Sequence, residues 1–153
     1  MEDDETLGAA REWLRHRVDE GAICPCCTQF AKVYRRRIHH TMARDLVILH
    51  QAVGSEWSHV ADVIAQNGRT FGGDFGKLTY WGLTEELQEK REDGGRAGWW
   101  RITPLGHRFV LREVRVPKYA RVYDGRCLSL TGEPVSITDA LGDKFDYDEL
   151  MNN

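Results

Sequence analysis

The stretch from residue 41 to residue 111 limits the possible folds most, because its apolar residues change period once, from helical to strand-like. They first recur every three or four positions, which predicts a helix with one apolar face. Gly54 is expected to end this helix. The apolar face consists of Met42, Leu46, Leu49 and Val53. A second helix capped by Ser58 and a third, glycine-interrupted helix over residues 73–81 are predicted next. A turn at Asn67-Gly68 separates them.

The second half of this stretch predicts a β-hairpin followed by one more helix. Residues Trp99–Thr103 are rich in strand formers, and the glycine-rich loop Glu92–Gly98 separates them from the preceding run. Thr103 and Pro104 then open a helix that ends at Leu111, because threonine caps helices well and proline fits the first helical position. The predicted order is therefore helix, helix, helix, hairpin, helix.

This order resembles a winged helix-turn-helix domain, in which the second and third helices form the helix-turn-helix and the hairpin is the wing. The string Ile102-Thr103-Pro104-Leu105-Gly106 is similar to the strand-to-helix junction of winged-helix regulators, where a glycine lets the next helix pack closely. We therefore expect an α+β fold with a winged-helix domain at residues 41–112. An N-terminal helix, a Cys-rich turn and a basic segment (residues 1–40) precede it, and a β-rich extension with an acidic tail (residues 113–153) follows it.

The two flanking regions predict short elements of both kinds. Thr6–Glu20 has helical spacing, and Phe30–Ile38 favours a strand or extended segment. Asp124-Gly125 is a strong signal for a two-residue hairpin. The other predicted elements are strands at Tyr119–Tyr123, Cys127–Leu130 and Val135–Ile137, a helical turn through Leu141 capped by Thr138 or Asp139, and a last amphipathic turn at residues 145–151.

The whole chain also resembles small hypothetical proteins encoded by actinobacterial phages. The likeness lies in the turn Cys24-Pro25-Cys26-Cys27 and in the closing string Asp139-Ala140-Leu141-Gly142…Phe145-Asp146-Tyr147. The resemblance implies a source, with the host cell cytoplasm as the location, and it implies no activity.

Charge is unevenly distributed along the chain. The formal net charge is −3, but residues 7–138 carry 15 acids against 20 bases, a net of +5, because both ends are acidic. A moderately basic middle suits a polyanionic partner, whereas acidic tails commonly only solubilise. No apolar run approaches the roughly 20 residues of a membrane span, and the acidic start differs from a signal peptide, so we expect a cytoplasmic protein.

Nucleic-acid contacts are predicted on two basic segments and on the third helix. Tyrosine interleaved with arginine suits phosphate contact combined with stacking. The predicted contact residues are Lys32, Tyr34, Arg35, Arg36, Arg37, Arg44, Lys77, Thr79, Tyr80, Arg96 and Arg101. The third helix is poor in the side chains that read base edges, so we expect a regulatory or accessory protein that binds double-stranded DNA through the winged helix together with the flanking basic segments. The alternative is a phage-type interaction module that binds or inhibits a host or phage protein.

The cysteine turn predicts a metal site but does not complete one. Cys24 and Cys27 have the Cys-x-x-Cys spacing of one zinc-ribbon knuckle, which can turn two thiolates onto one Zn²⁺. A closed site needs four ligands, and the chain has no second Cys-x-x-Cys. The available partners are His39, His40, Cys127 and Cys26. Three alternatives remain open: one structural zinc ion held within the chain, a zinc ion shared by a homodimer, or a metal-free turn of reduced thiols.

Catalysis is not expected. The chain has no nucleophile elbow and no zinc-protease helix. Gly94-Gly95-Arg96-Ala97-Gly98 superficially resembles a phosphate-binding loop, but it lacks the Lys-Ser/Thr ending and suits a wing tip better. A thioredoxin-like role for the Cys-x-x-Cys turn would require a βαβ pattern around it, and here the turn follows a helix and a glycine.

Overall fold

Helices and short strands alternate along the chain, which confirms the predicted α+β class. The structure, a computed structural model, describes residues 6–88 and 98–152, so the predicted wing loop and Arg96 lie outside it. The helices are α1 (Leu7–Arg15), α2 (His40–Val53), α3 (Val60–Gln66), the 3₁₀ helix η1 (Phe75–Trp81), α4 (Pro104–Val110), α5 (Ile137–Leu141) and α6 (Tyr147–Met151). The strands are β1 (Ala22–Ile23), β2 (Phe30–Ala31), β3 (Tyr34–Arg37), β4 (Ser58–His59), β5 (Thr84–Glu86), β6 (Trp99–Ile102), β7 (Val116–Tyr123) and β8 (Arg126–Val135).

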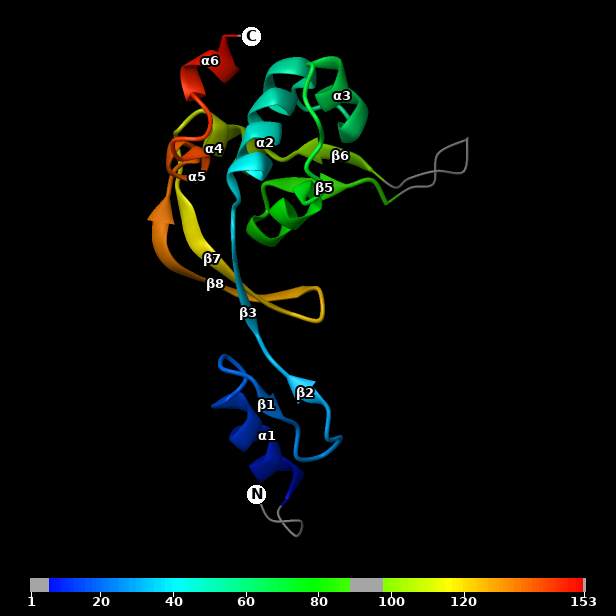
Figure 1. Cartoon of the computed structure of the whole chain (residues 1–153), viewed down its shortest axis with the longest axis vertical. Helices are drawn as coiled ribbons and strands as arrows, with labels where there is room; N and C mark the ends of the chain where they lie inside the picture. Colours follow the sequence, from blue (N-terminus) through cyan, green and yellow to red (C-terminus); the bar gives the residue numbers. More distant parts are fainter. Residues whose placement is uncertain (1–5, 89–97, 153) are drawn as a thin grey trace.

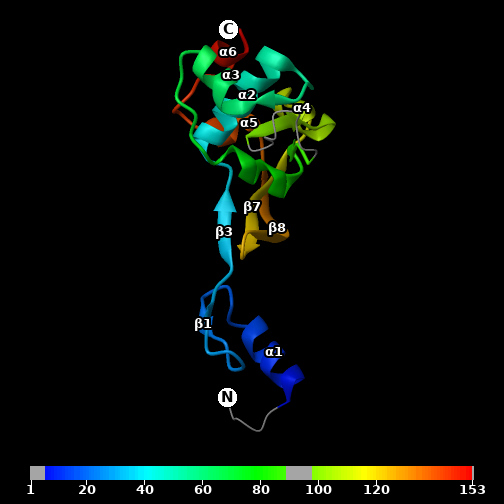
Figure 2. The ribbon, with the colours of Figure 1, turned by 90° about the vertical axis from the view of Figure 1, so that its right-hand side faces the viewer.

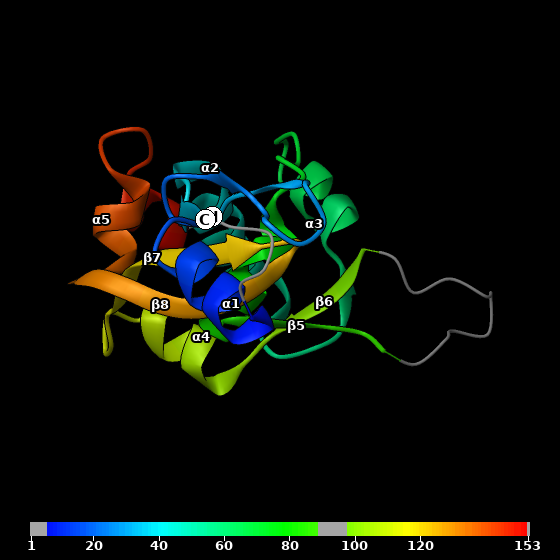
Figure 3. The same ribbon diagram turned by 90° about the horizontal axis from the view of Figure 1, so that it is seen from below.

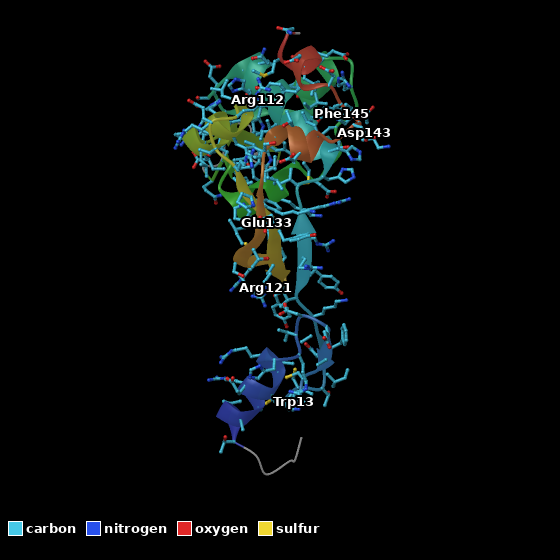
Figure 4. The ribbon with its side chains drawn as sticks, turned by 90° about the vertical axis from the view of Figure 1, so that its left-hand side faces the viewer. Trp13, Arg112, Arg121, Glu133, Asp143 and Phe145 are labelled. Carbon is cyan, nitrogen blue, oxygen red and sulfur yellow. The ribbon has the colours of Figure 1, made fainter. Side chains whose placement is uncertain are left out.

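The chain forms two parts of unequal size (Figure 1). Residues 6–33, with α1, β1 and β2, make a small N-terminal unit, and residues 34–152 make the body. Figure 2 shows the N-terminal unit standing apart from the helices of the body, with β3 running between them. An ion pair between Asp19 and Arg121, 2.9 Å long, ties the unit to β7. Figure 4 places Arg121 at the end of the body that faces the unit.

The core of the body surrounds α2. Residues 42–49 of this helix are all buried, and Leu46, Val47 and Leu49 are fully so. Helices α3, α4, α5 and α6 all contact α2. Across residues 6–88 and 98–152, none of the helices has the length and apolar character that a membrane crossing requires.

Three small sheets are present in the described part of the chain. Strands β1 and β2 pair within the N-terminal unit, and the body contains the antiparallel sheets β3-β7-β8 and β4-β6-β5. Figure 3 shows β5 and β6 extending together away from the helices. Strand β6 lies between β4 and β5, so a strand that precedes α3 pairs with the second strand of the β5–β6 hairpin.

Local sequence signals explain the best-predicted elements. Gly54, at φ 61°, ends α2 as expected. The Thr103 hydroxyl accepts the amide hydrogen bond of Gly106 at the start of α4, and Pro104 fills the first helical position. Asp124 and Gly125 both have positive φ, 50° and 74°, which is the conformation that a two-residue hairpin turn between β7 and β8 requires.

Several predicted boundaries were wrong. Ser58 belongs to β4 and its hydroxyl donates to the Glu56 carbonyl, so α3 begins later, after His59. Ile137 begins α5 and is not a strand residue, because Ser136 and Asp139 form a capping box there. Helix α1 ends at Arg15, and only turns continue to Glu20. The third helix is a 3₁₀ helix that starts at Phe75.

Candidate nucleic-acid interface

Strand β3 presents three consecutive arginines on the surface. It is an edge strand, paired on one side with β7 in the register Arg35↔Arg121 and Arg37↔Tyr119. All of its residues, Tyr34 through Arg37, are exposed at this edge of the sheet. Charged side chains are usual on an exposed edge strand, since they discourage pairing with another chain. The same charges form a row that an anion can reach.

A groove of about 240 Å³ lies between β3 and η1. Its lining residues are Arg35, Arg36, Arg37, His39, Met42, Asp74, Lys77 and Trp81. We call it the basic groove. Two segments that the sequence predicts as nucleic-acid contacts, 40 positions apart, therefore border the same hollow. Lys77 forms a 3.0 Å ion pair with Asp74 and remains about 40% exposed.

Aromatic rings support the cations beside this groove. The Arg36 guanidinium lies 5.3 Å from the centre of the Tyr34 ring, and the Lys32 ammonium lies 5.2 Å from the same ring. The Arg35 guanidinium lies 4.7 Å from the centre of the Tyr119 ring. Such contacts restrain long side chains without neutralising their charge, so the cations stay available to a phosphate.

Arg44 does not belong to this surface. Its side chain is buried, and its guanidinium donates to Asp45 at 2.8 Å and to the Thr70 carbonyl at 2.7 Å. Asp45 is 1% exposed, and burial raises the pKa of its carboxyl. The pair ties α2 to the loop before η1. Arg44 therefore has a structural role, which corrects its assignment as a nucleic-acid contact.

The other predicted contacts on η1 and the hairpin are mostly engaged within the protein. The Tyr80 hydroxyl donates to the Gly125 carbonyl at 3.2 Å, so it holds the β7–β8 turn against η1. The Thr79 side chain is exposed, and its hydroxyl donates to the Gly76 carbonyl. Arg101 pairs with Glu85 and lies 4.4 Å from the centre of the Trp57 ring. Arg96 lies outside the described residues.

A larger hollow, of about 470 Å³, is also bordered by His39. Its charged lining residues are Arg37, His39, His40, Lys118, Lys144, Asp139 and Asp143. Arg37 and His39 border both hollows. Lys118 on β7 belongs to the second basic segment that the sequence predicts, residues 96–126. Lys144, after α5, was not predicted as a contact, because only the folding of the C-terminal extension against the start of α2 brings it there.

The predicted metal ligands are not assembled within one chain. Cys24 and Cys27 lie in the turn between β1 and β2, His39 and His40 lie at the start of α2, and Cys127 lies in β8 against the core of the body. Among the residues that the structure describes, no group of three or more His, Cys, Asp or Glu side chains could hold a metal ion. What remains together is the two-thiol turn.

A chain of hydrogen bonds that the sequence did not reveal joins α2 to α4. The Nδ1 atoms of His50 and His107 are 2.8 Å apart, and the Nε2 atom of His107 is 2.8 Å from the Ser55 hydroxyl. Burial lowers the pKa of both imidazoles, and the charge on His107 lowers that of His50 further. One Nδ1 must donate and the other accept, so the pair is compatible with at most one imidazolium. The two residues are 57 positions apart, and no local pattern relates them.

We expect this pair to make the protein less stable in acid. A lowered pKa in the folded state means that the unfolded chain binds more protons as the pH falls below about 6.5, so the free energy of unfolding falls there. Urea midpoints between pH 7.5 and pH 5 should therefore decrease, and the decrease should be smaller in His107→Gln. Part of the decrease that remains in His107→Gln should come from His40, because burial also lowers the pKa of its imidazole. An equal decrease in both proteins would contradict a role for the pair.

No protein-family model, curated protein or solved structure matches this chain.

Proposed function

We propose that residues 41–112 form a winged helix and that the body binds double-stranded DNA through the basic groove. The element order α2, β4, α3, η1, β5, β6, α4 supports this proposal, as does the central position of β6 between β4 and β5. In this reading, η1 takes the place of the third helix. The observation that carries the proposal is the groove itself, because its lining combines the arginines of β3 with Lys77 of η1.

The proposed binding is dominated by phosphate contacts. Arginines 35–37 would lie along the backbone, and Tyr34 offers a ring for stacking. On η1, Lys77 and Thr79 are the polar side chains that face outward, whereas Tyr80 is held by the β7–β8 turn. Asp74 on the same groove repels phosphate unless Lys77 pairs with it. An interface with so few donors for base edges should distinguish poorly between sequences.

Salt dependence of duplex binding tests this proposal. About five phosphate contacts, from Lys32, Arg35, Arg36, Arg37 and Lys77, give a slope of log affinity against log salt of about −4.5. Affinity for a mixed-sequence duplex should therefore fall roughly 500-fold between 50 and 200 mM salt. Fluorescence anisotropy on two unrelated duplexes measures both the slope and the sequence preference. A flat salt profile, or no binding at 50 mM salt, would contradict DNA binding by the groove.

A specific surface favours the alternative, a protein-interaction module. Strand β8 is the second edge of its sheet, and it exposes Leu128 to 53% and Leu130 to 36%. Apolar side chains on an open edge strand suit the addition of a partner's strand. A stoichiometric partner that nuclease treatment leaves bound, and that Leu128→Ser with Leu130→Ser releases, would support this function over the first.

A further inference from the structure

The N-terminal unit has almost no core of its own. Among its described residues, 6–33, the buried apolar side chains are Ala10, Ala31 and Val33, two of which are alanines. Units of fewer than about 40 residues usually need a metal ion, disulfides or a second chain for stability. All of its cysteines are free thiols. Figure 4 shows the unit, marked by Trp13, standing clear of the helices of the body, so the body does not replace the missing core.

The turn between β1 and β2 has the hydrogen bonds of a metal-binding knuckle. The Cys24 amide donates to the Gln29 carbonyl at 2.8 Å, and the Thr28 amide donates to the Cys24 carbonyl at 2.9 Å. Thr28 has a φ of 64°, which closes the turn. The amides of Cys27 and Cys26 donate to the Cys24 sulfur. A thiolate held by backbone amides is the form in which cysteine binds Zn²⁺.

This knuckle supplies half of a tetrahedral site. The Cys24 side chain contacts those of both Cys27 and Cys26, and these two cysteines are exposed. The Cys-x-x-Cys spacing favours Cys27 as the second ligand. A structural zinc site uses four ligands. No further His, Cys, Asp or Glu in the described parts of the chain completes a group with them. The other two ligands of a closed site would therefore have to come from beyond the described residues of this chain.

The surface next to the knuckle suits a second copy. Ile23 precedes Cys24, and it faces Phe30 across the β1–β2 pair. Ile23 is 54% exposed and Phe30 is 61% exposed, although both are large apolar side chains. The Phe30 ring covers Gly21, where an added Cβ would lie 2.6 Å from it. In a dimer with twofold symmetry, Ile23 and Phe30 of one copy would face the same residues of the other copy. The two cysteine thiolates of each copy would face each other in the same way.

We propose that two copies of the chain share one Zn²⁺, bound by Cys24 and Cys27 of each copy, with Ile23 and Phe30 packed around the metal. Binding replaces any remaining thiol protons, which pass to solvent, and involves no change of oxidation state. The metal and the second copy together supply the core that the N-terminal unit lacks. This proposal does not depend on DNA binding by the body.

Metal content and mass of the full chain, purified in reductant without chelator, test the proposal. We expect about 0.5 equivalents of zinc per chain, since each copy offers two of four ligands. Native mass spectrometry should show two chains with one zinc ion. Cys24→Ser and Cys27→Ser should each lose the metal and become monomeric. The matched controls Cys26→Ser, in the same turn, and Cys127→Ser, in β8, should keep both the metal and the dimer.

Removal of the metal from the unaltered chain separates loss of ligands from misfolding of a variant. EDTA should convert the dimer to a monomer in reductant, and added Zn²⁺ should restore the dimer. One zinc ion per monomer, a dimer that persists without metal, or a monomer with no zinc at all would each overturn the shared site. Loss of zinc in Cys26→Ser to the same extent as in Cys27→Ser would overturn the assignment of ligands.

Discussion

Replacing Arg35, Arg36 and Arg37 together by alanine should lower the affinity for duplex DNA about 100-fold at low salt. This estimate takes about 1 kcal/mol for each phosphate contact, and 1.4 kcal/mol corresponds to a factor of ten. The salt slope should also become smaller by about 2.7, because three contacts no longer release counterions. All three side chains are exposed on an edge strand, so their loss should leave the fold intact. Anisotropy titrations at several salt concentrations measure both changes.

A matched variant separates the position of the charges from their number. Arg11, Arg108 and Arg115 are exposed and lie outside the basic groove. Their replacement by alanine removes the same three charges, and it should reduce the affinity much less than the β3 variant does. If the two triple variants bind equally, the interaction is a response to net charge and β3 has no special role. If the β3 variant binds like the unaltered chain, the basic groove is not the contact surface.

The fold could be predicted best where one residue imposes a backbone conformation. Thr103 and Pro104 start α4, and Gly54 ends α2, as their sequence positions indicate. The Asp124-Gly125 turn forms because both residues tolerate a positive φ. These signals act within a few residues, so sequence alone reveals them.

Prediction failed where partners distant in sequence decide the local structure. Ser58 looks like a helix cap, but pairing of Ser58 with Trp100 draws it into β4. The sequence around η1 has helical spacing, yet the segment forms a 3₁₀ helix whose Phe75, Leu78 and Trp81 are buried in the core. Ile137 is a different case, because the signal there is local: the capping box of Ser136 and Asp139 starts a helix after Val135, although residues 135–137 look like one strand. A prediction from local sequence weighs the propensities of neighbouring residues and takes no account of a strand that pairs from elsewhere in the chain.

The same limit applies to the candidate site. The exposure of the three β3 arginines could be predicted from the sequence, because three consecutive charged side chains are rarely all buried. Burial of Arg44 does not follow, since it depends on Asp45 and on the Thr70 carbonyl, 26 positions away. The meeting of β3 with Lys77 likewise depends on the tertiary fold. The sequence therefore predicts which kinds of residue make an interface, and the fold decides which of them reach it.

Replacing Gly106 by alanine should lower the free energy of unfolding by about 3 kcal/mol, the upper end of the range for overpacking a core. An added Cβ would lie 2.1 Å from the Leu83 carbonyl oxygen and 2.5 Å from the Ile102 side chain. The first of these is a backbone atom, which cannot rotate away. Relief of the clash would require α4 to move off the β5–β6 sheet, where Phe109 is fully buried. Urea denaturation measures the change.

Gly8→Ala is the matched control for this effect, because it makes the same substitution in another helix. The nearest atom to an added Cβ at Gly8 is the Thr6 hydroxyl oxygen, at 3.9 Å, which is an ordinary contact. Alanine favours the helix over glycine by up to about 1 kcal/mol, so this variant should be as stable as the unaltered chain or slightly more stable. Equal stability of the two variants would mean that α4 does not pack against residue 83 as closely as the structure describes. A large loss in Gly106→Ala alone would show that the close approach of α4, and not helix propensity, requires glycine at this position.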